Sequence, residues 1–123
     1  MIDLKDIQPD SPFLEQLALT GDGPVTLVNT FVAPPGEIPA VVEAWRRDSE
    51  IMKGRPGFVS AQLHQGVGTS HVLVNVAVWE SADALREAFL HPSFQATLPL
   101  YPDGSVSYPV LTRTVAVPGI CVA

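Results

Sequence analysis

Asn75 and Trp79 are the side chains of this sequence whose type and spacing best suit a chemical role. They stand four residues apart in the largely apolar stretch His71–Trp79. In a β-strand, residues of equal parity share a face, so this amide and this indole point the same way. The amide can bind a substrate carbonyl or enolate oxygen, and the indole ring offers a flat wall for an aromatic ligand. A structural role, with Asn75 bonded to the backbone and Trp79 packed in the core, stays open.

The opposite face of the same predicted strand consists of valine alone, at positions 72, 74, 76 and 78. Burying one valine is worth roughly 1.5–3 kcal/mol, so a row of exposed valines favours association. We therefore expect this sheet face to pack against a second copy of the chain, which gives a homodimer.

A second amide, Asn29, stands in the β-branched stretch Val25–Val32, where Phe31 shares its face. If this strand neighbours the one that carries Asn75, the two amides flank one cavity. Leu85 and Phe89 belong to the apolar side of a predicted helix over 82–90. We expect Asn29, Phe31, Leu85 and Phe89 to bind the substrate.

Two histidines, His64 and His71, bracket a predicted six-residue hairpin loop over 65–70. As cross-strand neighbours they suit a base at the mouth of the pocket, and we include both among the substrate-binding candidates. A solvated hairpin end is the plainer interpretation. A metal site is not expected, because no third ligand or known metal-binding spacing accompanies them.

The order of predicted elements defines the fold class. Strands are expected over 25–32, 58–64, 71–79 and 110–117, and helices over 38–52 and 82–90, with a further short helix over 93–98. This β-α-β-β-α-β order is typical of an α+β, ferredoxin-like fold with one antiparallel sheet. Residues 1–23 are expected to form an arm with a short helix near 11–19 that cannot bury much on its own, 24–118 the domain, and 119–123 a tail. Trp45 is expected in the core, and Tyr101 in a turn near the pocket mouth.

The composition excludes several kinds of partner. Seven Lys and Arg against 13 Asp and Glu give a net charge of −6, so the basic surface that nucleic acids and anionic membranes require is absent. No apolar run approaches the ~18 residues of a membrane span, and the acidic N-terminus is unlike a signal peptide. We expect a cytoplasmic protein with no nucleic-acid or membrane partner.

Several segments together resemble the antibiotic biosynthesis monooxygenase family of the dimeric α/β-barrel superfamily. They are the strand Val25–Phe31, the helix that carries Trp45, the PGFVS segment at 56–60 and the NVAVWES segment at 75–81. The resemblance covers about residues 25–117. It implies a homodimer in which two sheets face each other as a dimeric α/β barrel.

The resemblance also implies an activity. Some members oxidise anthrone-like aromatic polyketides to quinones with O₂ and no cofactor, and their Asn and Trp of the N-x-x-x-W motif hold the substrate oxygens. Asn75 and Trp79 occupy these positions and are our catalytic candidates, whereas Leu85 and Leu98 stand where that branch has a polar tyrosine and arginine. We expect a cofactor-independent monooxygenase. A polyketide cyclase or isomerase, or a non-catalytic small-molecule-binding dimer, is the alternative.

Overall fold

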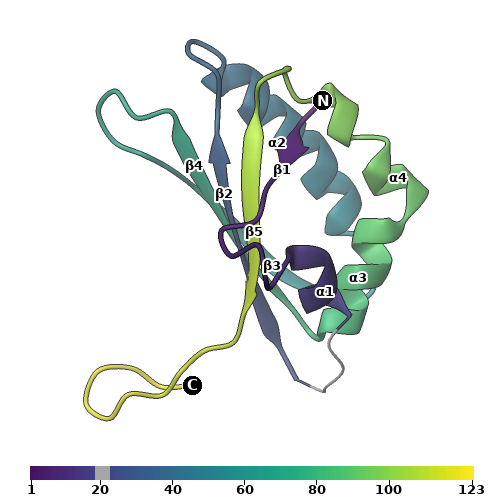
Figure 1. The fold of residues 1–123 in the computed structure, drawn as a ribbon. Helices are drawn as coiled ribbons and strands as arrows, with labels where there is room; N and C mark the ends of the chain where they lie inside the picture. Colours follow the sequence, from purple (N-terminus) through teal and green to yellow (C-terminus); the bar gives the residue numbers. More distant parts are fainter. Residues whose placement is uncertain (19–22) are drawn as a thin grey trace.

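A five-stranded sheet with helices on one face forms the body of the protein. The computed structural model describes residues 1–18 and 23–123 (Figure 1). In chain order its elements are β1 (Asp3–Leu4), α1 (Phe13–Leu17), β2 (Val25–Val32), α2 (Ile38–Met52), β3 (Phe58–Gln65), β4 (Val72–Trp79), α3 (Ala82–Leu90), α4 (Pro92–Gln95), the 3-10 helix η1 (Leu98–Leu100) and β5 (Val106–Thr112).

The strands lie in the order β1-β5-β2-β4-β3. β2 pairs antiparallel with both β4 and β5, and β3 pairs antiparallel with β4, whereas the short β1 runs parallel to β5. The predicted α+β, ferredoxin-like fold is confirmed. Strands β2 and β4 are central neighbours, which is the condition that the shared cavity requires.

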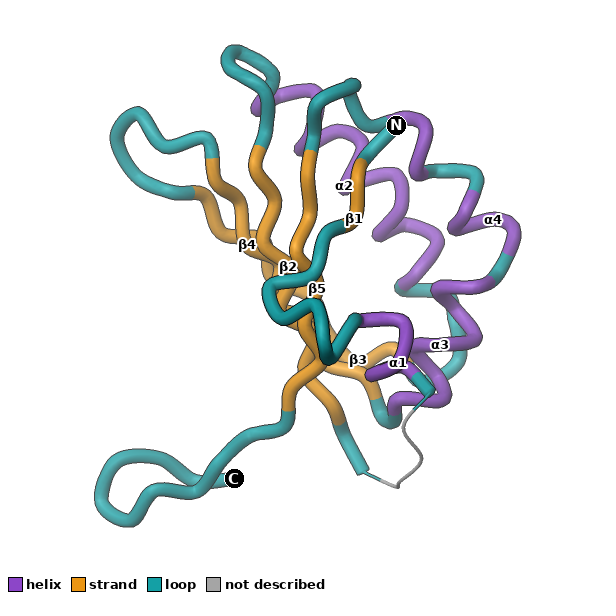
Figure 2. Tube along the Cα trace, viewed as in Figure 1, coloured by secondary structure: helices purple, strands orange, loops and turns teal. Residues whose placement is uncertain are grey.

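All four α-helices lie on the same side of the sheet (Figure 2). α2 turns Val41, Ala44 and Asp48 inward, at the spacing of one helical face. α3 begins after Ser81, whose Oγ accepts a hydrogen bond of 3.1 Å from the backbone N–H of Ala84, as the sequence predicts. The space between this helical layer and the sheet is where the core and the pocket lie.

The core is divided into two clusters. One contains Leu27, Ala77 and Trp79, and the other contains Phe31 and Leu73. On β2 and β4 the asparagines occupy the positions between these clusters, because side chains of equal parity follow one another along the same face. A pair of polar side chains on the two central strands therefore separates two apolar regions of the inner face.

The valine row lies on the sheet face that carries no helix. Val74 and Val76 of β4 are only partly buried in the single chain. Their cross-strand partners are His64 and Gln62 on β3 and Thr30 and Val28 on β2. We call this helix-free side the outer face, and it keeps the mixture of valine and polar residues that the alternation predicts.

The last strand differs from the prediction of 110–117. It runs over Val106–Thr112 and contains Pro109. The backbone N–H of Leu111 points away from β2 and donates to Gln16. Pro109 lies two residues earlier, so its backbone nitrogen points to the same side. β1 does not extend as far as Pro109 on that side, so the missing N–H of the proline costs no strand pairing. β5 ends at Thr112, opposite Thr26, because β2 starts only one residue earlier. Beyond Thr112 the chain extends away from the body (Figure 1).

The N-terminal segment, which is not expected to bury much on its own, packs into the core of the domain. Ile2, Phe13 and Leu17 are at most 4% exposed. β1 supplies backbone pairing along β5, and α1 contacts the same strand. The predicted helix near 11–19 is present as α1, and position 19 lies outside the described residues.

Candidate active site

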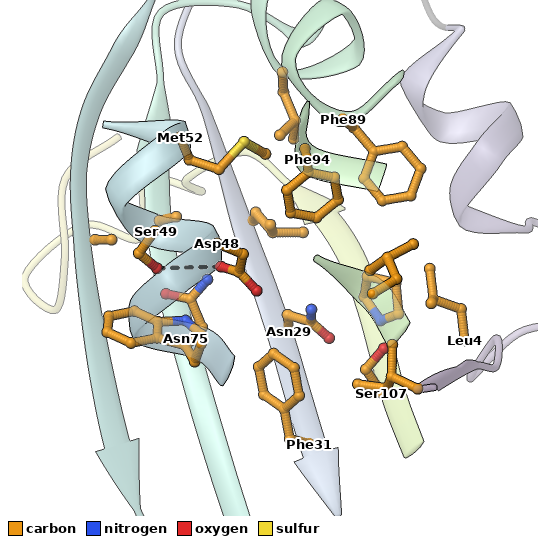
Figure 3. Close-up of a pocket in the computed structure, with 18 of the residues that line it drawn as sticks. Leu4, Asn29, Phe31, Asp48, Ser49, Met52, Asn75, Phe89, Phe94 and Ser107 are labelled. Carbon is orange, nitrogen blue, oxygen red and sulfur yellow. Dashed lines mark hydrogen bonds between the residues drawn. The ribbon is translucent and has the colours of Figure 1, made fainter. Parts of the chain in front are cut away.

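Asn29 and Asn75 lie directly opposite each other on β2 and β4. Their register places both side chains on the inner face, where both line one pocket beneath α2. Figure 3 shows the two amides with the α2 residue Asp48 around the same space. The expectation that the two amides flank one cavity is confirmed.

Each of the two amides has a buried oxygen without a hydrogen-bond partner among the described residues. These atoms are Oδ1 of Asn29 and Oδ1 of Asn75, and both are shielded from solvent. The indole Nε1 of Trp45, which lines the same pocket from α2, is in the same condition. An unsatisfied buried polar group costs about 1–3 kcal/mol, so three at one pocket indicate a place where a polar ligand supplies the missing partners.

The pocket is narrow and mostly apolar. Its cavity volume is about 70 Å³, below the range of about 300–1,000 Å³ typical of small-molecule sites, so a ligand with fused rings requires the lining side chains to move apart. Aromatic pairs form much of its wall. Phe58 packs edge-on against Trp79 with ring centroids 5.4 Å apart, and Phe31 stacks on Tyr101 at 5.9 Å. Such flat walls suit an aromatic ligand.

One carboxylate reaches this pocket. Asp48, on the inner face of α2, is 8% exposed and accepts hydrogen bonds from the Tyr101 hydroxyl and, at 3.3 Å, from the Ser49 hydroxyl. Burial raises the pKa of Asp48 to about 7, although the two hydrogen bonds lower it in part. Burial, together with the nearby Asp48, raises the pKa of Tyr101 well above its ordinary value, so Tyr101 is the neutral donor.

Asp48 is a pocket residue that was not predicted from the sequence. A signal was present, because Asp48 follows Trp45 by three residues on the apolar stripe of the helix, where a carboxylate has no ordinary reason to stand. Tyr101, expected in a turn near the pocket mouth, is instead 2% exposed and bound to Asp48. Trp45, expected in the core, also lines the pocket.

Six of the eight predicted site residues lie together, and their roles remain predictions. The residues that line the pocket are Asn29, Phe31, Asn75, Trp79, Leu85 and Phe89.

The histidines lie elsewhere. His64 pairs with Val74, on the outer face, and the backbone bond from Gly66 to Val72 closes the hairpin. The expected cross-strand pairing of His64 with His71 is therefore wrong, and neither residue lines the pocket.

Residues 1–18 and 23–123 contain no arrangement of side chains that resembles a metal site. No cluster of three or more His, Cys, Asp or Glu side chains in that part of the chain could hold a metal ion. Every helix described there is too short or too polar to span a bilayer.

Comparison with known proteins places this geometry in a family. Residues 24–99 match the family model for antibiotic biosynthesis monooxygenases. The chain belongs to the antibiotic biosynthesis monooxygenase family.

Solved structures of similar fold agree. A protein of Shewanella loihica PV-4, whose monooxygenase function is itself only proposed, is 31% identical over 80% of this chain and all of its own, with a TM-score of 0.67. SnoaB of Streptomyces nogalater, described as a cofactor-independent oxygenase, is 27% identical over 79% of this chain and 98% of its own, with a TM-score of 0.64. No curated protein sequence gives a significant match. The family and these structures support a monooxygenase-type function.

Proposed function

We propose that this protein is a cofactor-independent monooxygenase that oxidises an electron-rich, hydroxylated aromatic compound with O₂. An anthrone or quinol of the polyketide type is the substrate class we have in mind. The observation that carries the proposal is the pair of opposed, unpartnered amides, Asn29 and Asn75, in an apolar pocket with aromatic walls. The likeness to SnoaB, a cofactor-independent oxygenase, adds support.

The polar groups of the pocket suit the oxygen atoms of such a substrate. An amide oxygen accepts a hydrogen bond from a phenolic hydroxyl, and an amide nitrogen donates one to a carbonyl oxygen. The Trp45 N–H, also without a partner, offers another donor. Hydrogen bonds to a carbonyl oxygen strengthen as that oxygen becomes an enolate, so they stabilise the anion that reacts.

The enolate then reduces O₂ directly, and the protein contributes orientation and exclusion of bulk water. For a substrate with a CH₂ group beside the rings, CH₂ plus O₂ gives C=O plus H₂O. The substrate itself supplies the electrons, so this stoichiometry requires no external reductant.

We further propose that the protein acts as a homodimer joined through the outer face. The valines of β4, among them Val74 and Val76, are only partly buried in the single chain. A second copy that covers them removes apolar surface from water at roughly 25 cal/mol per Å².

A polyketide cyclase or isomerase in the same pocket is the second candidate, and the buried carboxylate of Asp48 favours it. Such an enzyme moves protons and consumes no oxygen. The non-catalytic binding dimer would hold the ligand and leave it unchanged.

An oxygen electrode separates these functions. Purified protein, treated with a chelator and supplied with anthrone alone, is expected to consume one O₂ for each anthraquinone formed, as measured by chromatography. Isomerised or cyclised product without O₂ uptake would favour the second candidate. Binding of anthrone with no product of either kind would overturn the enzymatic proposal.

A further inference from the structure

Asp48 is an acid without a cation. It is 8% exposed on the inner face of α2, and its hydrogen bonds come from two neutral hydroxyls, Tyr101 Oη and Ser49 Oγ. None of the ion pairs found among the described residues includes it. Figure 3 shows the bond from Ser49 and the carboxylate beside the two amides.

A structural role explains this arrangement poorly. Buried carboxylates that stabilise a fold are paired with a cation or held by several donors. Here burial of the carboxylate is the main influence on Asp48 and raises its pKa to about 7. The group therefore exchanges its proton near neutrality, which is the property that general acid–base chemistry requires.

The pocket offers no competing base. Among the described residues that line it, Asp48 and Tyr101 are the only titratable side chains. The pKa of Tyr101 is raised, so its hydroxyl stays protonated and donates to Asp48. His64 and His71, the other candidates that the sequence suggests, do not line the pocket.

Building on the proposed function, we infer that Asp48 is the proton acceptor of this site and that Tyr101 and Ser49 are positioning residues. In the step assigned to it, an acidic C–H or phenolic O–H bond of the substrate breaks and a new O–H bond forms on the Asp48 carboxylate. The electron pair stays on the substrate as an enolate or phenolate. When O₂ has been reduced, Asp48 returns the proton to the oxygen atom that leaves as water.

The experiment isolates proton transfer from oxidation. Anthrone is incubated anaerobically with the protein in D₂O, and loss of its C10 hydrogens is followed by NMR. The wild-type protein is expected to accelerate exchange, with a rate that falls about tenfold per pH unit below pH 7. Asp48→Asn, which keeps the shape of the side chain, is expected to lower that rate at least 100-fold.

Two further variants separate a chemical from a structural role. Glu50→Gln lies on the same helix and is solvent-exposed, so it is expected to exchange anthrone like the wild type. Tyr101→Phe removes a hydrogen bond that lowers the pKa of Asp48, so the midpoint of the pH profile is expected to move upward. Melting temperatures of all variants verify that they fold.

The inference is overturned if Asp48→Asn exchanges at the wild-type rate, or if wild-type protein that binds anthrone gives no exchange above buffer. It is also overturned if the midpoint of the pH profile of exchange is the same in Tyr101→Phe as in the wild type. This measurement does not depend on whether Asp48→Asn folds. Exchange without O₂ consumption in air would instead overturn the oxygenase proposal and leave Asp48 as the acceptor. O₂ consumption by Asp48→Asn at the wild-type rate would overturn Asp48 as the proton acceptor and leave the oxygenase proposal standing.

Discussion

Replacing Asn75 by leucine is expected to stabilise the protein and to disable it. Oδ1 of Asn75 is buried without a partner, and such a group costs about 1–3 kcal/mol. Leucine has a similar size and removes that cost. It also adds apolar contacts with Leu73 and Ala77, the core residues on either side of position 75. The free energy of unfolding is therefore expected to rise by about 1–3 kcal/mol, or roughly 3–6 °C in Tm per kcal/mol.

The same substitution removes a hydrogen bond to the substrate oxygen that becomes anionic. Loss of one such donor typically costs about 100- to 1,000-fold in kcat. Thermal unfolding followed by circular dichroism and O₂ uptake with anthrone measure the two effects on the same preparation. A gain in stability with a loss of turnover is the expected pair of results.

Gln16→Leu is the matched control. The Gln16 amide is satisfied, because Nε2 donates to the Ser11 carbonyl at 3.0 Å and Oε1 accepts from the Leu111 N–H at 2.8 Å. Its loss is expected to lower the free energy of unfolding by about 1–3 kcal/mol and to leave turnover nearly unchanged. If Asn75→Leu destabilised the protein as Gln16→Leu does, Asn75 would be a structural residue and the reasoning would be refuted.

Three other substitutions test separate parts of the structure. Val76→Asp places a charge on the outer face and is expected to yield a monomer in sedimentation at micromolar concentration, and a dimer that persisted would exclude this face as the interface. Gly57→Ala is expected to lower the Tm by several degrees more than Gly68→Ala, because both glycines have positive φ but a Cβ at Gly57 would stand 2.4 Å from Cβ of Ala84, whereas none stands within 4 Å at Gly68. The pKa of Asp48 rises from 3.8 to about 7 on folding. Folded protein thus holds a proton that the unfolded chain has lost, and stability falls as the pH rises from about 4 to 7. Asp48→Asn is expected to lack this part of the denaturant-measured pH dependence, and equal profiles would contradict the raised pKa.

The alternation of side chains along β2 and β4 is enough to predict the inner and outer faces of the sheet. It assigns Asn29, Asn75 and Trp79 to one face, because side chains of a strand alternate between the two faces and strand pairing then fixes the face of every residue. The predicted strand over 25–32 and helices over 38–52 and 82–90 have the observed bounds of β2, α2 and α3.

What the sequence missed depends on contacts between distant segments. Asp48 and Tyr101 are 53 residues apart in the sequence. No local sequence pattern shows that the residue after η1 contacts α2. β1 is two residues long, too short to show any period, and it pairs with β5, a segment about 100 residues away in the sequence. The pairing of His64 with Val74 follows from how the hairpin loop closes, which alternation does not determine.

The substrate is expected to bind between the sheet and the helices, through the amides of Asn29 and Asn75. The most direct measurement is a titration of protein labelled with ¹⁵N at its asparagine side chains, using anthraquinone as a ligand that does not react further. We expect the side-chain amide signals of both asparagines to shift together, with one dissociation constant. If the ligand bound and neither signal moved, binding through these two amides would be contradicted.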